Sequence, residues 1–69
     1  MLDTQKPENF LRLSDVIKRT GLSRSSIYLN IKNGRFPKNI IIGARSVGWL
    51  ESEINAWMQT RIEQRYHHQ

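Results

Sequence analysis

The amino-acid sequence predicts a mainly α-helical domain with a small β-hairpin, arranged as a winged helix-turn-helix. Two short helical patterns separated by a glycine lie between residues 13 and 34, and a β-branched stretch with a turn follows at 38–49. Helical spacing returns from residue 50 to about residue 64. A chain of 69 residues has room for one small domain. We assign residues 10–64 to this domain, residues 1–9 to a flexible N-terminal arm and residues 65–69 to a frayed C-terminal tail.

The first predicted helix begins near Ser14, whose hydroxyl can cap the helix start. Val16 and Ile17 supply its apolar face. Gly21 follows the last helical residue and can adopt positive φ without a Cβ penalty, so we expect the helix to end there and the chain to turn sharply. A short helix, a glycine turn and a second helix are typical of a helix-turn-helix.

Ser23 is the expected cap of the second helix, which Asn33 and Gly34 should end. Ile27 and Ile31 are four residues apart, so both point inward. In a common helix-turn-helix the apolar positions of this helix lie three apart, and Asn30 would then occupy the second of them. We therefore expect Ile31 to take the apolar role.

The predicted wing is a β-hairpin formed by residues 38–42 and 46–49, with the turn at 43–45. Arg45 lies at or next to the tip, where it is well placed to meet a phosphate backbone or a minor groove. Gly48, between two apolar strand residues, indicates a bulge or a close approach of another backbone segment.

The third predicted helix, residues 50–64, closes the core. Its apolar stripe consists of Ile54, Trp57, Met58 and Ile62. Trp49 and Trp57 could in principle stack on single-stranded bases, but both fall on apolar stripes, and we assign them to the core.

The basic charge is concentrated in the predicted helix-turn-helix and wing. The chain has a net charge of +5, and residues 12–45 hold eight basic side chains against Asp15 alone, a net of +7. Residues 1–11 and 46–69 each have a net charge of −1. A polyanion such as nucleic acid is the expected partner. Charge alone favours this interpretation no more than a basic surface that keeps a small domain in solution.

Other classes of function lack the residues they need. Without cysteine the sequence has neither disulfides nor thiolate metal sites, and His67 and His68 stand in the predicted tail without a further ligand or a nucleophile beside them. The glycines do not form a phosphate-binding loop. Apolar runs long enough for a membrane span or a signal peptide are missing. We expect a cytoplasmic protein that is not an enzyme and uses no cofactor and no metal.

The outward side of the second helix contains the best candidates for contact with double-stranded DNA. Small serines at the helix start allow close approach to the major groove, Arg24 can offer a bidentate fork to guanine, and Tyr28 and Lys32 can reach phosphates. Tyr28 also lies beside the inward stripe, so packing at the rim of the core is an equal interpretation. The predicted DNA-binding residues are Ser23, Arg24, Ser25, Tyr28, Lys32, Arg35, Lys38 and Arg45.

Four motifs in this order, LSRSSIY, GRFPK, GARSVGW and ESEINAW, carry a resemblance to a known family. Between about Leu11 and Met58 the chain resembles the AlpA-like phage and prophage transcriptional regulators, small winged-helix proteins related in fold to excisionases and to the DNA-binding part of MerR-type regulators. The resemblance implies that Ser23, Arg24 and neighbouring residues lie on the recognition helix and Arg45 in the wing. It also implies a role at a prophage or integrative element.

The expected function is sequence-specific binding of double-stranded DNA to regulate transcription of such an element, promoting integrase expression or excision. One alternative is an excisionase, a recombination directionality factor that acts at attachment sites. Another is a protein-interaction module whose second helix or wing inhibits a partner protein. An integrase or another protein is a possible partner, and we expect no membrane and no small-molecule substrate.

Overall fold

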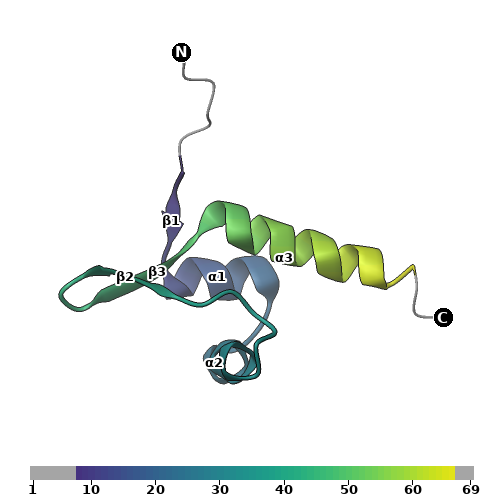
Figure 1. Cartoon of the computed structure of the whole chain (residues 1–69), viewed down its shortest axis with the longest axis horizontal. Helices are drawn as coiled ribbons and strands as arrows, with labels where there is room; N and C mark the ends of the chain where they lie inside the picture. The colour runs from purple at the N-terminus through teal and green to yellow at the C-terminus, as the bar shows by residue number, and fades with distance from the viewer. Residues whose placement is uncertain (1–7, 67–69) are drawn as a thin grey trace, which may run out of the picture.

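A computed structural model describes residues 8–66 and contains three helices and three strands in this part of the chain (Figure 1). The elements are β1 (Phe10–Leu11), α1 (Leu13–Thr20), α2 (Arg24–Lys32), β2 (Ile40–Gly43), β3 (Ser46–Leu50) and α3 (Glu51–Gln64). α1 and α2 form the helix-turn-helix, and the β2–β3 hairpin extends to one side as the wing (Figure 1). The predicted winged helix-turn-helix is confirmed.

α1 begins two residues earlier than the capping prediction requires. Arg12 is the N-cap and Ser14 is a helical residue, so the prediction that Ser14 caps the helix is wrong. Asp15 instead accepts a hydrogen bond from the backbone N–H of Arg12 at 3.1 Å, which satisfies a donor that the helix start leaves free. Gly21 ends the helix as expected, with φ of 77° and its N–H donating to the Ile17 carbonyl at 2.8 Å.

α2 begins and ends at the predicted residues. The Ser23 hydroxyl accepts a hydrogen bond from the Ser26 backbone N–H at 3.1 Å. At the other end Gly34 has φ of 72°, and the Arg35 backbone N–H reaches back to the Asn30 carbonyl at 2.8 Å. These two features are those of a Schellman motif, which turns the chain away from the helix axis.

The sheet has three strands, ordered β1-β3-β2, where the sequence indicated only the hairpin. β1 pairs antiparallel with β3 and places Leu11 opposite Trp49. This pairing explains Gly48, because a Cβ there would lie 2.9 Å from the Leu11 carbonyl oxygen, closer than real Cβ atoms approach. The predicted close backbone approach is thus confirmed. The irregularity in the hairpin lies instead between Ile41 and Gly43.

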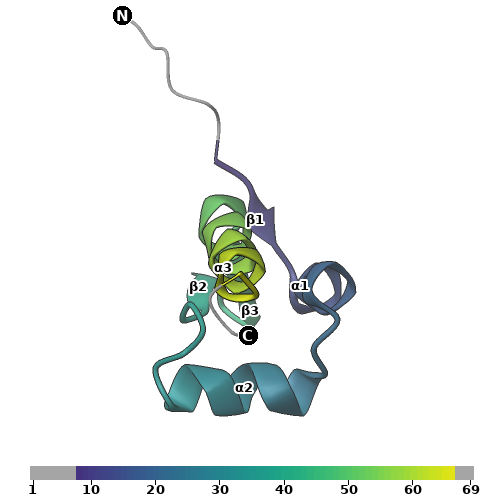
Figure 2. The same cartoon turned by 90° about the vertical axis from the view of Figure 1, so that its right-hand side faces the viewer.

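The core lies between the sheet, α1, α2 and α3, with Trp49 at its centre. Its buried members are Leu11, Val16, Ile27, Phe36, Trp49 and Ile54. The Trp49 indole N–H donates to the Pro37 carbonyl at 2.9 Å, so the one polar atom of this buried side chain is satisfied. Figure 2 shows α2 running crosswise beneath α3, which leaves the far side of α2 uncovered.

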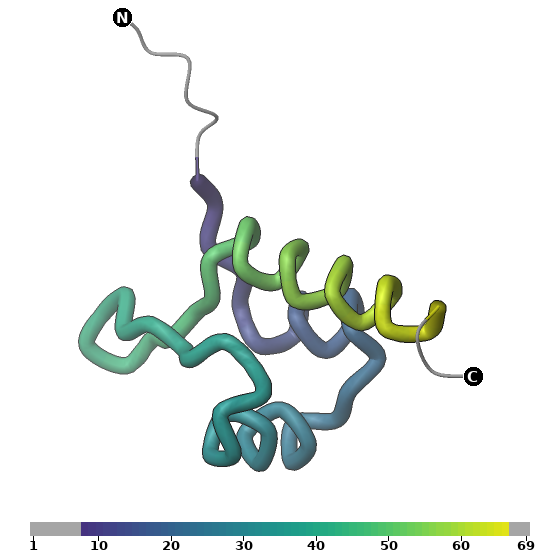
Figure 3. The backbone as a smooth tube through the Cα atoms, turned by 45° about the vertical axis from the view of Figure 1, so that its right-hand side comes forward, coloured from purple at the N-terminus to yellow at the C-terminus, as the bar shows by residue number. Residues whose placement is uncertain are grey.

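The first half of α3 packs on the core and its second half extends past it. Ile54 is fully buried, and Trp57 and Met58 are partly buried against the core. Ile62 is 44% exposed, so the expected apolar stripe continues beyond the surface that buries it. Figure 3 shows the last turns of α3 projecting beyond α1 and α2.

A polar network fixes the start of α3. Glu51 donates its backbone N–H to the Asn9 carbonyl at 2.9 Å, and its carboxylate pairs with Arg19 of α1 at 2.9 Å. The side-chain amide of Asn9 and then the guanidinium of Arg19 hold the pKa of Glu51 below its usual range. Glu8 and Asn9, assigned to the arm from the sequence, both bond to residues at this helix start.

Candidate DNA-binding surface

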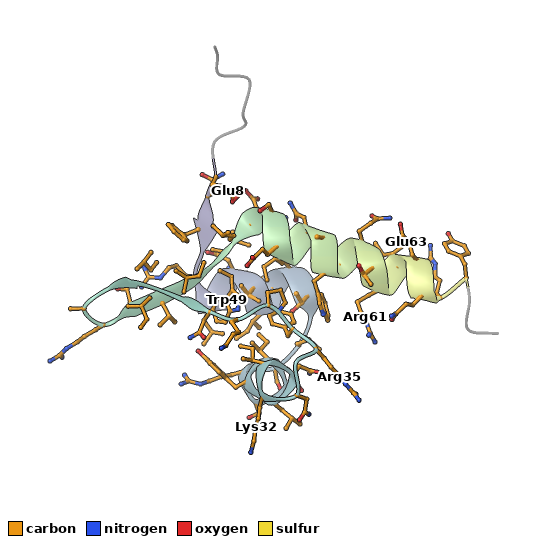
Figure 4. The ribbon with its side chains drawn as sticks, in the orientation of Figure 1. Glu8, Lys32, Arg35, Trp49, Arg61 and Glu63 are labelled. Atoms are coloured by element: carbon orange, nitrogen blue, oxygen red, sulfur yellow. The ribbon has the colours of Figure 1, made fainter. Side chains whose placement is uncertain are left out.

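The outward face of α2 is exposed and polar while the inward face is buried. Arg24, Ser25 and Lys32 are exposed, whereas Ile27 is completely buried. Lys32 projects from α2 away from the body of the molecule (Figure 4). An α-helix presented in this way, without a covering layer, has the dimensions that fit a B-DNA major groove about 12 Å wide.

The start of α2 is held rigid by its own hydroxyl groups. Ser23 and Ser26 hydroxyls lie 3.1 Å apart, and the Ser26 carbonyl accepts a hydrogen bond from the Asn30 side chain at 2.7 Å. Asn30 is therefore satisfied locally, and the partly buried Ile31 packs against the core, which confirms the role expected for it. Leu29, which the sequence analysis left without a role, is 58% exposed on this helix.

Tyr28 lies at the boundary between the two faces of α2. Its ring meets the Trp49 ring edge-on with centroids 6.3 Å apart, and the residue is partly buried against the core. The Arg24 guanidinium sits 5.7 Å from the Tyr28 ring centroid. Packing at the core rim is thus observed, and Tyr28 also supports Arg24. Its predicted DNA contact stays a prediction.

The wing presents its turn, Ala44 and Arg45, to solvent. The hairpin extends well to one side of α2 (Figure 1). Ile41 on β2 is 79% exposed, so the wing is apolar along this strand as well as basic at its tip. Lys38 is exposed on the connection that leads from α2 to β2.

Arg35 is separated from the other predicted residues. It follows α2 and projects on the side away from the wing, where it lines a cavity together with Arg61 of α3 (Figure 4). Its carbonyl accepts a hydrogen bond from the Trp57 indole N–H at 2.8 Å. The surface formed by Ser23, Arg24, Ser25, Lys32 and Arg45 therefore does not continue directly into Arg35.

Arg61 was not among the residues predicted from the sequence. It lies four residues after Trp57 on α3, and its guanidinium is 5.7 Å from the Trp57 ring centroid. An arginine one turn after a tryptophan on a helix is a recognisable signal for such a contact.

The basic side chains of the surface are not neutralised within the domain. Between residues 8 and 66 the ion pair of Arg19 with Glu51 is the only one, so Arg24, Lys32 and Arg45 have no carboxylate partner there. Free cations on one exposed face are the arrangement that attracts a phosphate backbone and releases its counterions.

Within the described part of the chain, no three residues of the metal-binding types cluster in a way that could hold an ion. None of the helices from α1 to α3 is long and apolar enough to cross a membrane. His67 and His68, considered as metal ligands from the sequence, lie outside the described residues, as do residues 1–7 of the predicted arm.

A crosswise α2 with an exposed polar face, flanked by a basic hairpin, places this chain among the winged helix-turn-helix proteins. Residues 9–62 match the family model for the prophage CP4-57 regulatory protein (AlpA), and the chain belongs to this family. It is 41% identical over 68 residues to the DNA-binding transcriptional activator AlpA of Escherichia coli K12, covering 90% of this chain and 97% of that protein.

A second relative is the uncharacterized protein ORF88 of Enterobacteria phage P4. It is 49% identical over 55 residues, which cover 80% of this chain and 62% of the phage protein. The matched region thus spans less than two thirds of that relative. The family resemblance that the four sequence motifs predict is confirmed.

Proposed function

We propose that this protein binds double-stranded DNA sequence-specifically and regulates transcription of a prophage or integrative element. The observation that carries the proposal is the exposed face of α2, with Arg24 and Lys32 free of carboxylate partners among residues 8–66, beside a wing that ends in Arg45. The name of the E. coli relative, a DNA-binding transcriptional activator, supports activation as the direction of control.

In the proposed complex α2 enters the major groove. Arg24 reads a guanine edge, and Ser23 and Ser25 let the helix backbone approach closely. Leu29, exposed on the same helix, is suited to contact a thymine methyl group. Lys32, Lys38, Arg45 and the hydroxyl of Tyr28 contact the backbone. The protein acts in the cytoplasm without catalysing a reaction.

The biological outcome that we propose is increased integrase expression or excision of the element. An excisionase that acts directly at attachment sites is the second candidate, supported by the apolar wing strand, because exposed isoleucine side chains such as Ile41 can wedge between base steps and bend DNA. Selection of bound fragments from the host genome distinguishes the two. Sites at a promoter support transcriptional control, and sites confined to attachment regions support the excisionase.

The test of DNA binding is titration of random duplex DNA at several salt concentrations. About five phosphate contacts should give a slope of log K against log salt of roughly −4 to −5. A protein-interaction module with this charge would show only weak, non-saturating association. A slope near zero would exclude the proposed function.

A further inference from the structure

A groove lies beside α2 on the side away from the wing. It is formed by the end of α1, the end of α2 and the second half of α3, and its volume is about 380 Å³. The groove belongs neither to the outward face of α2 nor to the wing. Its apolar lining consists of Leu22, Trp57, Met58 and Ile62, and Arg35 and Arg61 stand at its edge.

The apolar lining of the groove is only partly covered by the domain itself. Leu22 and Met58 are partly buried, and Ile62 is 44% exposed where α3 projects past the core. A concave site with apolar walls and a few polar side chains at its edge has the make-up of a binding pocket. The volume is near the lower end of the range of about 300–1,000 Å³ for ligand pockets, which suits a few anchoring side chains.

The edge of the groove has positive charge that the domain does not neutralise. Trp57 contacts both arginines, because its indole N–H donates to the Arg35 carbonyl at 2.8 Å and its ring lies 5.7 Å from the Arg61 guanidinium carbon. Neither guanidinium has a carboxylate partner among residues 8–66. Figure 4 shows Arg35 and Arg61 projecting on the same side of the molecule.

We propose that this groove binds an acidic amphipathic helix of a partner protein. The partner's apolar side chains enter between Met58 and Ile62, and its carboxylates meet Arg35 and Arg61, which is the helix-in-groove mode of recognition. A phosphate backbone would use the two arginines but would leave the apolar lining in water. Arg35 and Arg61 line the groove and Lys32 does not, so the partner and DNA would use different basic side chains (Figure 4).

The probe is a labelled synthetic peptide of about 18 residues with leucines on one helical face and glutamates beside them. A second peptide has lysine in place of each glutamate. Fluorescence anisotropy without DNA measures both affinities, so the result does not depend on the proposed DNA binding. The acidic peptide should bind at least about tenfold more tightly than the basic one.

Matched variants separate groove binding from general charge attraction. Arg61→Glu should weaken the acidic peptide about tenfold or more and strengthen the basic one. Arg65→Glu changes charge equally on the same helix end but lies outside the groove lining, and should change affinity less than about twofold. Ile62→Ser should weaken binding while Ile41→Ser, on the wing, should not. Circular dichroism melts confirm that each variant is folded.

Two results overturn the proposal. Equal weakening by Arg61→Glu and Arg65→Glu means that the peptide responds to net charge alone. Absence of peptide binding, together with a larger loss of random-DNA affinity and salt slope for Arg61→Glu than for Arg65→Glu, means that the groove arginines contact the DNA backbone instead. In that second case the parent protein still binds DNA, so the groove proposal fails while the proposed function stands.

Discussion

The two faces of α2 differ in almost every physical property. On the inward face Ile27 is completely buried, and Tyr28 packs edge-on against Trp49. On the outward face Arg24 and Lys32 are exposed and have no carboxylate partner among residues 8–66. One face packs into the core, with Tyr28 against Trp49 of β3, and the other is available to a ligand.

This difference teaches that a nine-residue helix can present the residues that stabilise the fold on one face and those proposed to bind DNA on the other. Buried apolar atoms contribute in proportion to the area that folding removes from water, whereas exposed cations contribute little to folding and much to attraction of a polyanion. Substitutions on the inward face should therefore lower the free energy of unfolding, and substitutions on the outward face should lower the affinity for DNA.

The largest effect is expected from Trp49→Ala, on the packed side. This fully buried side chain should cost about 3–5 kcal/mol of unfolding free energy, close to the entire stability of so small a domain. Trp57→Ala, at a partly buried position, should cost less. Chemical denaturation measures the free energy of unfolding of both variants. If Trp57→Ala unfolds the domain and Trp49→Ala does not, the centre of the core is misplaced.

The next effect concerns Arg24, on the exposed side. Arg24→Ala should weaken binding to a cognate site by about 1–3 kcal/mol beyond any loss on random DNA, because a base contact is lost. The melting temperature should stay near that of the parent. Titrations against cognate and scrambled fragments give the result, and an equal loss on both fragments would assign Arg24 to the backbone.

Ser23 combines a structural role with a proposed binding role, since it caps α2 and lies where the helix is proposed to enter the DNA major groove. Ser23→Ala should cost about 0.5–2 kcal/mol of stability through loss of the hydrogen bond to the Ser26 N–H. Ser23→Asp restores the cap but adds a negative charge facing phosphates. Melting curves and DNA titrations of both variants separate the roles. An aspartate variant with unchanged DNA affinity would show that the helix start does not approach DNA.

The smallest effect is expected at the wing. Arg45→Ala should weaken cognate and random DNA by similar amounts and reduce the salt slope by about one, because one backbone contact is lost. Stability should not change, as Arg45 is exposed in the turn. Titration at several salt concentrations measures the slope. Loss of discrimination in this variant would mean that the wing, and not α2, recognises the sequence.

The local structure of this chain is largely determined by its sequence. Ser23 and Gly34 delimit α2 and Gly21 ends α1, because capping and positive φ depend on near neighbours. The hairpin turn is Ala44 and Arg45, within the predicted 43–45, and Gly43 belongs to β2. The four motifs likewise identified the family that the comparisons confirm. Ser14 is the local exception, because the helix begins at Leu13 and Asp15, its third residue, accepts a hydrogen bond from the Arg12 backbone N–H.

Contacts between distant segments were decided only by the tertiary structure. A segment of two residues, Phe10 and Leu11, is too short to show a strand pattern in the sequence. It joins the sheet because β3 has a free edge and Gly48 leaves room for its backbone. Arg35 was grouped with the DNA-binding residues by charge and chain position. The turn after α2 places it in the lining of the same groove as Arg61 of α3, 26 positions along the chain. No periodicity within one element can indicate such a groove.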